Sequence, residues 1–164
     1  MTNESRCIAA IGRRAFAFLF IGDHDALSVE DAPIRNGLLD GVALAGRLRA
    51  MRPDIIVIEK PQPGHRIAVP QSRRHLDTVF AHRVSFGIAQ GVAAGLGVPS
   101  NEISSTRWRR HFGVSKNIQA VHLKALHTWP SRVDLFGKEK HVVRAEAALL
   151  ALYAARCLSR EESR

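Results

Sequence analysis

Apolar residues in the first part of the chain occur in short runs broken by turn residues, a pattern typical of consecutive strands. The runs cover residues 8–11, 15–21 and 26–30. In the second run, small residues alternate with phenylalanine at the outset. We therefore predict an antiparallel meander of three strands, with a tight turn at Arg13–Arg14 between the first two.

From residue 38 onward the pattern changes, and helices alternate with strands. Apolar residues recur at helical spacing from Leu38 until Pro53, which predicts a first helix. The segment 54–58, in which Asp54 precedes four apolar β-branched residues, is typical of a strand buried on both faces, and Glu59 follows it. Further elements are predicted as helices over 76–96, 115–129 and 142–158, a short strand over 102–105 and a basic amphipathic turn over 106–112.

This order of elements predicts an α/β fold with a mixed five-stranded sheet, in which three antiparallel strands precede parallel strands and helices flank the sheet. The length fits a single domain over 1–164, with 1–6 and 159–164 as frayed tails. The proline-containing segment 60–74 predicts a mobile basic loop. Three glycines spaced by four indicate close helix packing or a contact between two copies; they are Gly87, Gly91 and Gly95.

The composition adds a strong positive charge to this picture. Lysine and arginine number 24 against 15 aspartate and glutamate residues, which gives a net charge of +9 and a pI near 10.7. Residues 101–164 hold twelve of the basic and six of the acidic side chains, and so supply +6 of the total. A polyanionic partner, above all nucleic acid, would explain such a charge, although a solvated basic face without a partner is the alternative.

Cysteine content and hydropathy exclude several classes of protein. Cys7 and Cys157 are far apart, and two cysteines predict neither a disulfide framework nor a metal knuckle, which fits a reduced, cytoplasmic setting. The apolar run 15–21 is far shorter than the ~20 residues that span a bilayer, and no signal-peptide cleavage site follows it. We therefore expect no membrane association.

Three side chains are candidate metal ligands. Glu59 directly follows the buried strand, so its carboxylate must either pair with Lys60 or an arginine or bind a metal ion. Glu146 lies in the first turns of a helix rich in alanine and leucine, where the helix dipole alone would favour a glutamate. His141 can approach Glu146 only from the loop before that helix, and a lone histidine is more commonly structural than a ligand.

Basic residues in the 60–74 loop and around Trp108 are candidates for contacts with phosphates. Trp108 is expected to pack inward while the neighbouring arginines face outward. These candidates are Lys60, Arg66, Arg73, Arg74, Arg107, Arg109, Arg110 and Lys116.

Several short segments, each weak alone, form a specific pattern in their order and spacing. They are Val29–Pro33, Asp40–Gly41, Ala43–Leu44, Arg52–Lys60, Pro63–Gly64, Ser85–Gly87, Leu96–Pro99, Trp108–Arg109, Phe112–Gly113 and Arg144–Leu150. Over about residues 8–158 the chain resembles the phage and bacterial branch of RuvC-like Holliday junction resolvases. The resemblance implies a ribonuclease-H-like fold, a homodimer, and nicking of branched DNA with Mg²⁺ or Mn²⁺.

The resemblance also implies a ligand set, and this chain departs from it. In the family, four acidic positions, or three acids and a histidine, hold two metal ions that activate water and stabilise the leaving oxygen. Glu59 and Glu146 match two of these positions. The family's first strand ends in Ile-Asp-Pro-Gly, with the Asp bridging both metals, whereas this chain reads Ile11-Gly12-Arg13-Arg14.

The fourth position is changed as well. Val142 and Val143 stand four and three residues before Glu146, which leaves His141 as the remaining candidate ligand. With two or three ligands of four, tight binding of two Mg²⁺ ions is not expected. Arg13 and Arg14 stand where the metals would lie and could instead bind the scissile phosphate directly.

The sequence leaves three hypotheses of function. The first is a protein of this family that binds four-way junction or duplex DNA, with nuclease activity impaired or lost because Gly12 replaces the first catalytic Asp. The second is an active Mg²⁺-dependent, structure-selective endodeoxyribonuclease that uses Glu59, Glu146 and His141. The third is a protein-interaction scaffold whose charge maintains solubility.

Overall fold

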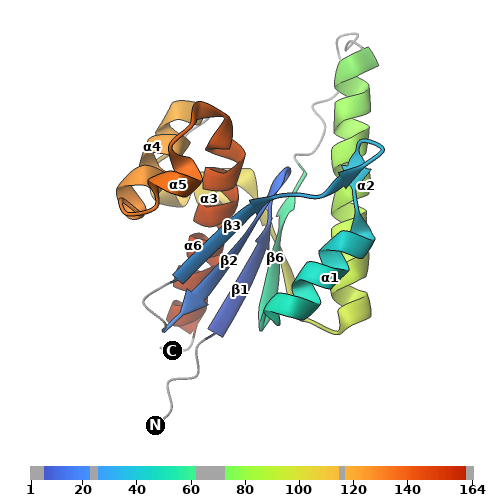
Figure 1. The fold of residues 1–164 in the computed structure, drawn as a ribbon, viewed down its shortest axis with the longest axis horizontal. Coiled ribbons are helices and arrows are strands. Elements are labelled where there is room, and N and C mark those ends of the chain that lie inside the picture. Colours follow the sequence, from blue (N-terminus) through green and yellow to red (C-terminus); the bar gives the residue numbers. More distant parts are fainter. Residues whose placement is uncertain (1–5, 23–25, 62–72, 115–116, 162–164) are drawn as a thin grey trace.

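Five strands form one mixed sheet in the order β3-β2-β1-β6-β7 in the computed structural model of the chain (Figure 1). The structure describes residues 6–22, 26–61, 73–114 and 117–161. The strands are β1 (Arg6–Ile11), β2 (Ala15–Ile21), β3 (Ala26–Asp31), β4 (Ile34–Arg35), β5 (Leu38–Leu39), β6 (Ile55–Lys60) and β7 (Ser100–Ser104). The helices are α1 (Gly41–Met51), α2 (Arg73–Leu96), α3 (Ser105–Phe112), α4 (Ile118–Thr128), α5 (Val133–Phe136), the 3₁₀ helix η1 (Glu139–His141) and α6 (Val142–Glu161).

The strand pairing confirms the predicted fold class. β1, β2 and β3 form an antiparallel meander, in which Ile8 of β1 lies opposite Leu19 of β2. β6 and β7 are parallel to β1, with Ile8 opposite Ile55. The carboxyl ends of β1, β6 and β7 therefore meet at the same edge of the sheet.

The first residues of β2 direct small side chains to one face of the sheet and large ones to the other. Ala10, Ala15 and Ala17 belong to the core on the α6 side, where α6 contributes further alanines. Phe16 and Phe18 fill the opposite core, against α1 and α2. Figure 1 shows α1 and α2 on one side of the sheet and α3 to α6 on the other. Small residues on both partners let the sheet and α6 approach closely, and this packing fixes the position of α6 relative to the carboxyl edge.

The segment before α1 differs from the prediction. Leu38 was expected to begin a helix, but Leu38–Leu39 form β5, which pairs with β4 across a turn at Asn36 and Gly37. Both turn residues have positive φ, 51° and 78°, as an Asn-Gly hairpin turn requires. The helix starts only at Gly41, because the Asp40 carboxylate accepts hydrogen bonds from the first free N–H groups, at 3.0 and 3.1 Å.

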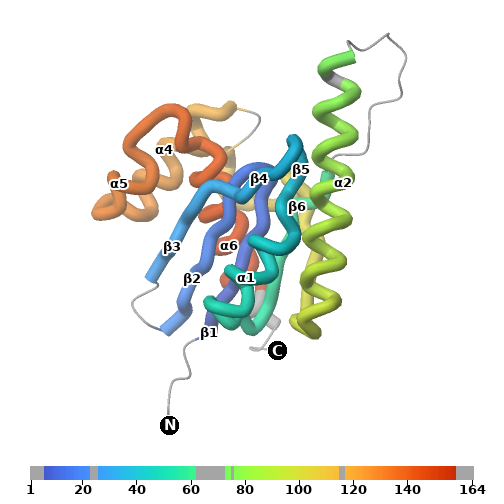
Figure 2. The backbone as a smooth tube through the Cα atoms, turned by 45° about the vertical axis from the view of Figure 1, so that its right-hand side comes forward, coloured from blue at the N-terminus to red at the C-terminus, as the bar shows by residue number. Residues whose placement is uncertain are grey.

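The long helix α2 runs past the edge of the sheet, as Figure 2 shows. It begins at Arg73, so Arg73 and Arg74 of the predicted loop lie in its first turn, while residues 62–72 fall outside the described residues. No neighbouring atom lies within 4 Å of where a Cβ would stand at Gly87, Gly91 or Gly95. Within the chain, these glycines therefore do not provide the close helix packing that their spacing suggested.

The C-terminal helices follow the predicted order with shifted ends. α4 is capped by Asn117, whose side chain accepts a hydrogen bond from Gln119 N at 2.9 Å, and the predicted cap Ser115 lies outside the described residues. α6 continues through residues 159–161, which were assigned to a tail. In the part of the chain that the structure describes, no helix is long and apolar enough to cross a membrane.

Candidate functional site

Glu59 lies near the carboxyl end of β6 and is buried, with 9% of its surface exposed. Its Oε1 accepts a hydrogen bond from the Trp108 indole Nε1 at 3.3 Å, and the backbone N–H of Arg13 also donates to the carboxylate. Burial raises the pKa of Glu59, and the hydrogen bonds together with the charges of Arg109 and Arg13 oppose that rise. The predicted alternative partner, Lys60, instead forms an ion pair with Glu102 at 3.3 Å.

Glu146 lies on α6 and forms an ion pair with the guanidinium of Arg109. Burial and the nearby negative charge of Glu59 raise its pKa to about 7, although Arg109 and Arg13 favour the ionised form. The structure thus brings together Glu59 and Glu146, the two acidic residues that the sequence singled out. Removing two carboxylates from water at one place is costly unless cations or donors compensate.

Helix α3 supplies that compensation with two consecutive residues. Trp108 is fully buried, as predicted, and binds Glu59. Arg109 was expected to face outward with the other arginines, but its guanidinium turns inward to Glu146, and its side chain is only 17% exposed. The guanidinium carbon also lies 4.8 Å from the centre of the Trp108 ring. Arg109 turns inward because the buried carboxylate opposite α3 requires a positively charged partner.

Gly12 lies at the carboxyl end of β1, beside these carboxylates. Its N–H donates to the Ala15 carbonyl at 3.0 Å and closes the turn that carries Arg13 and Arg14. A Cβ at this position would meet Ala15 O at 3.2 Å and the Cβ of Ala147 at 3.5 Å. A side chain here would therefore extend toward Ala147, the residue that follows Glu146 on α6. This position holds no carboxylate in the present chain.

His141 lies apart from the two glutamates. It is buried in η1, and its Nδ1 has no hydrogen-bond partner within the described residues. The charged groups that act on it are those of Arg144, Lys140, Lys138 and Asp31, and burial is the main cause of its lowered pKa. Asp31 is held by Arg144 in a two-bond ion pair, at 2.8 and 2.9 Å. Neither Glu59 nor Glu146 is among its charged neighbours.

The residues present do not fit a two-metal centre. Among residues 6–22, 26–61, 73–114 and 117–161, no group of three or more His, Cys, Asp or Glu side chains could hold a metal ion. Glu59 accepts a hydrogen bond from Trp108, and Glu146 forms an ion pair with Arg109. Arg109 therefore already supplies a positive charge to this pair of acids. Two carboxylates are fewer oxygen ligands than the four positions that a two-metal site of this family uses.

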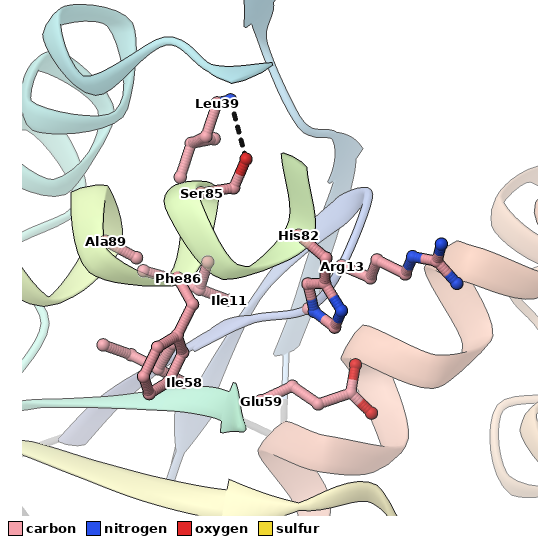
Figure 3. A pocket seen from close by; sticks show the side chains of 10 residues that line it. Ile11, Arg13, Leu39, Ile58, Glu59, His82, Ser85, Phe86 and Ala89 are labelled. Atoms are coloured by element: carbon pink, nitrogen blue, oxygen red, sulfur yellow. Dashed lines mark hydrogen bonds between the residues drawn. The ribbon is translucent and has the colours of Figure 1, made fainter. Parts of the chain in front are cut away.

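A cleft opens over the two carboxylates, and α2 supplies a wall that the sequence did not predict. Thr78, His82 and Arg83 of α2 line it together with Arg13, Glu59, Arg109 and Glu146. Figure 3 shows the ring of His82 and the carboxylate of Glu59 pointing toward one another from α2 and β6. Burial and the charges of Arg13 and Arg83 lower the pKa of His82. The sequence does contain a signal that His82 faces the sheet. At helical spacing, His82 and Ser85 continue the stripe of the buried Ala89 and Ala93.

A second cleft shares Arg13, Thr78 and His82 with the first. Its further basic residues are Arg14, Arg74 and Lys140, and its acidic residues are Asp31 and Asp77. Arg13 and Arg14 are exposed at the turn between β1 and β2, as are Arg73 and Arg74 at the start of α2. Of the predicted basic residues, Arg13, Arg14 and Arg74 line this cleft, and Arg13, Lys60 and Arg109 line the first. Because the two clefts share Arg13, Thr78 and His82, we refer to them together as the hollow.

The remaining predicted phosphate contacts lie on α3 or outside the described residues. Arg107 and Arg110 are exposed on α3, and Arg107 bonds the hydroxyl of Tyr153. Arg66 and Lys116 lie outside the residues that the structure describes. Only Arg109, of the three α3 arginines, is directed at the carboxylates.

Comparison with known proteins identifies the fold. No protein-family profile matches the chain, and no curated protein matches it by sequence. Among solved structures, Thermus thermophilus RuvC in complex with a Holliday junction substrate is similar over 93% of this chain and 96% of that one, with a TM-score of 0.56 and 14% identity. Another Thermus thermophilus RuvC structure is similar over 92% and 96%, with a TM-score of 0.54 and 13% identity. The chain therefore has the ribonuclease-H-like fold of the RuvC-type Holliday junction resolvases.

Proposed function

We propose that this chain is a DNA-binding protein with a RuvC-like fold in which metal-dependent cleavage has been lost or impaired. The observation that carries the proposal is the Arg109–Glu146 ion pair beside Glu59. This pair supports the proposal because a protein cation beside the two carboxylates would compete with metal ions for them. Gly12 removes a further carboxylate from the same edge of the sheet. His141 faces Asp31 and Arg144 and does not restore the ligand set.

The charge around the site supports a nucleic-acid partner. Both clefts include Arg13. The other basic residues are Arg14, Arg74 and Lys140 in one cleft and Lys60, Arg83 and Arg109 in the other. Exposed arginines bind phosphates through charge and hydrogen bonds without reading bases. The net charge of +9 adds long-range attraction for any polyanion. We propose that DNA phosphates enter the hollow at Arg13 and Arg14.

A four-way junction is the first DNA to test. The similar Thermus thermophilus RuvC has been solved with a Holliday junction substrate, and the similarity covers nearly the whole of both chains. A duplex of equal length serves as the comparison, because phosphate contacts alone do not distinguish the two.

We also propose that two copies of the chain associate through α2. Phe80 and Leu76 are 66% and 44% exposed on this helix. Further along α2, the glycines Gly87, Gly91 and Gly95 have no atoms near their missing side chains. A second α2 could pack closely on this open stripe and cover the exposed apolar side chains. Such a dimer would carry two basic hollows.

The test combines DNA binding with nicking. Binding is measured by fluorescence anisotropy in EDTA, and nicking is measured on the same junction with Mg²⁺ or Mn²⁺. We expect tight binding without metal and no nicks. Nicking by the unmodified protein that disappears in Glu59→Gln would instead establish the endonuclease hypothesis. An absence of binding to any DNA at low salt would contradict both and leave an interaction scaffold.

A further inference from the structure

Two consecutive residues of α3 each serve a different buried carboxylate. The Trp108 indole donates to Glu59 Oε1 at 3.3 Å, and the Arg109 guanidinium pairs with Glu146 Oε1. Trp108 is fully buried, and the side chains of Arg109 and Glu146 are 17% and 19% exposed. Helix α3 therefore presents a hydrogen-bond donor and a positive charge together at the carboxyl edge of β6.

The charges at this place are balanced within the protein. Both carboxylates interact favourably with Arg109 and with Arg13, and unfavourably with each other across the gap between β6 and α6. When both acids are ionised, two negative charges thus face two positive ones. A buried carboxylate without such a partner would be strongly destabilising, so the arginines are part of what allows both acids to be buried.

We propose that Arg109 is the resident counter-ion of Glu59 and Glu146, and that its guanidinium excludes divalent cations from a site that these carboxylates would otherwise form. Removal of the Arg109 charge then opens that site to a divalent ion. The inference goes beyond the proposed function, because it concerns the protein and the metal alone and holds whether or not the chain binds DNA.

The exclusion has two physical parts. Glu59 Oε1 already accepts a hydrogen bond from Trp108, and Glu146 Oε1 is paired with Arg109. A cation that bound these oxygens would have to displace a protein donor. The fixed charge of the guanidinium also repels any cation close enough to bind both acids. Without Arg109, two carboxylates on rigid elements remain, and oxygen ligands of this kind suit Mg²⁺ and Mn²⁺.

The experiment uses Mn²⁺ as the probe and the two indole N–H signals of the protein as reporters. The chain holds two tryptophans, Trp108 and Trp129, and Trp129→Phe assigns their signals. A Mn²⁺ ion at Glu59 would broaden the Trp108 signal selectively, because that indole binds Glu59 directly. In the unmodified protein we expect the Trp108 signal to broaden no more than the signal of Trp129, because Trp108 is fully buried and Trp129 only half-buried. A selective loss of the Trp108 signal there would overturn the proposal.

The variant arm compares Arg109→Gln with Arg110→Gln, a matched loss of one positive charge on the same helix at an exposed position. We expect Arg109→Gln to bind Mn²⁺ at least about tenfold more tightly than Arg110→Gln, with selective broadening of Trp108. Adding Glu146→Gln to Arg109→Gln should remove this binding. A folded Arg109→Gln that binds Mn²⁺ no better than Arg110→Gln contradicts the proposal. If Arg109→Gln does not fold, the Mn²⁺ titration of the unmodified protein still tests the proposal, because a selective loss of the Trp108 signal there overturns it.

Discussion

The guanidinium of Arg109 on α3 pairs with the carboxylate of Glu146 on α6, at the edge where the parallel strands end. The pair thus lies at the edge where open α/β sheets bind their ligands. Glu59 lies beside it, held by Trp108. The two buried acids at this edge thus each have a partner from α3, Trp108 for Glu59 and Arg109 for Glu146.

The first prediction concerns the hydrogen bond between Trp108 and Glu59. Trp108→Phe removes the indole donor and leaves a buried acceptor without it, which should cost about 1–3 kcal/mol of unfolding free energy beyond the lost volume. The control is Trp129→Phe, since Trp129 is half-buried against Phe136, with ring centres 5.9 Å apart. Urea unfolding of both variants tests this. Equal losses would mean that the bond to Glu59 contributes nothing.

The second prediction concerns pH. The pKa of Glu146 is about 7 in the folded protein against an ordinary value of 4.5, so the folded state binds more protons between these values. Its contribution to stability is complete below pH 4.5 and is lost as the pH rises through 7. The free energy of unfolding should fall over this range, by at most about 1.4 kcal/mol per pH unit for a single group.

Glu146→Gln should flatten that pH dependence and leave only the slope that the raised pKa of Glu59 produces. Urea unfolding at intervals from pH 4.5 to 7.5 measures it. Asp134→Asn is the control, because Arg132 lowers the pKa of Asp134 and its titration lies below this window. Parallel profiles for Glu146→Gln and the unmodified protein would contradict the expectation.

The overall fold could be predicted from sequence because its signals are local. The alternation of alanine and phenylalanine in β2 assigns small residues to α6 and large ones to α1 and α2. The unbroken apolar run of β6 identified a central strand. The Asn36–Gly37 turn was also readable, as a two-residue hairpin signal, but the helical spacing that begins at Leu38 obscured it.

The candidate site could be predicted only in part, because its partners are distant in sequence. Glu59 and Glu146 were found from their unusual positions in apolar elements. The inward direction of the Arg109 side chain was not predicted, because it depends on the Glu146 carboxylate 37 positions away, which no local pattern reveals. His82 was missed for a similar reason: its role arises where α2 crosses the end of β6.

The third prediction places a carboxylate at Gly12. Gly12→Asp should be less stable than Gly12→Ala, because both add a Cβ 3.2 Å from Ala15 O but only Asp adds a charge beside Glu59 and Glu146. The difference should be small at pH 5 and grow to about 1–3 kcal/mol at pH 8, where more of the acids are ionised. Thermal unfolding at both pH values measures it. A difference independent of pH would show that the Asp side chain does not face the glutamates.

The fourth prediction concerns association through α2. Phe80→Glu adds a charge to the exposed stripe, and burying it in a dimer would be unfavourable. Sedimentation equilibrium should therefore give a dimer for the unmodified protein and a monomer for Phe80→Glu. Val42→Glu on α1, an equally exposed apolar position, should remain dimeric. A monomeric unmodified protein at high concentration would end the dimer proposal.

The fifth prediction separates the arginines of α3 in DNA binding. Arg110 is exposed, whereas Glu146 already neutralises Arg109. Arg110→Ala should weaken binding to a four-way junction irrespective of base sequence and reduce the slope of log K against log salt by about 1. Arg109→Ala should change that slope less, because its charge is not available to a phosphate. Anisotropy titrations at several salt concentrations measure both slopes. An unchanged slope in Arg110→Ala would remove α3 from the DNA-facing surface, and a larger change in Arg109→Ala would mean that DNA competes with Glu146 for its guanidinium.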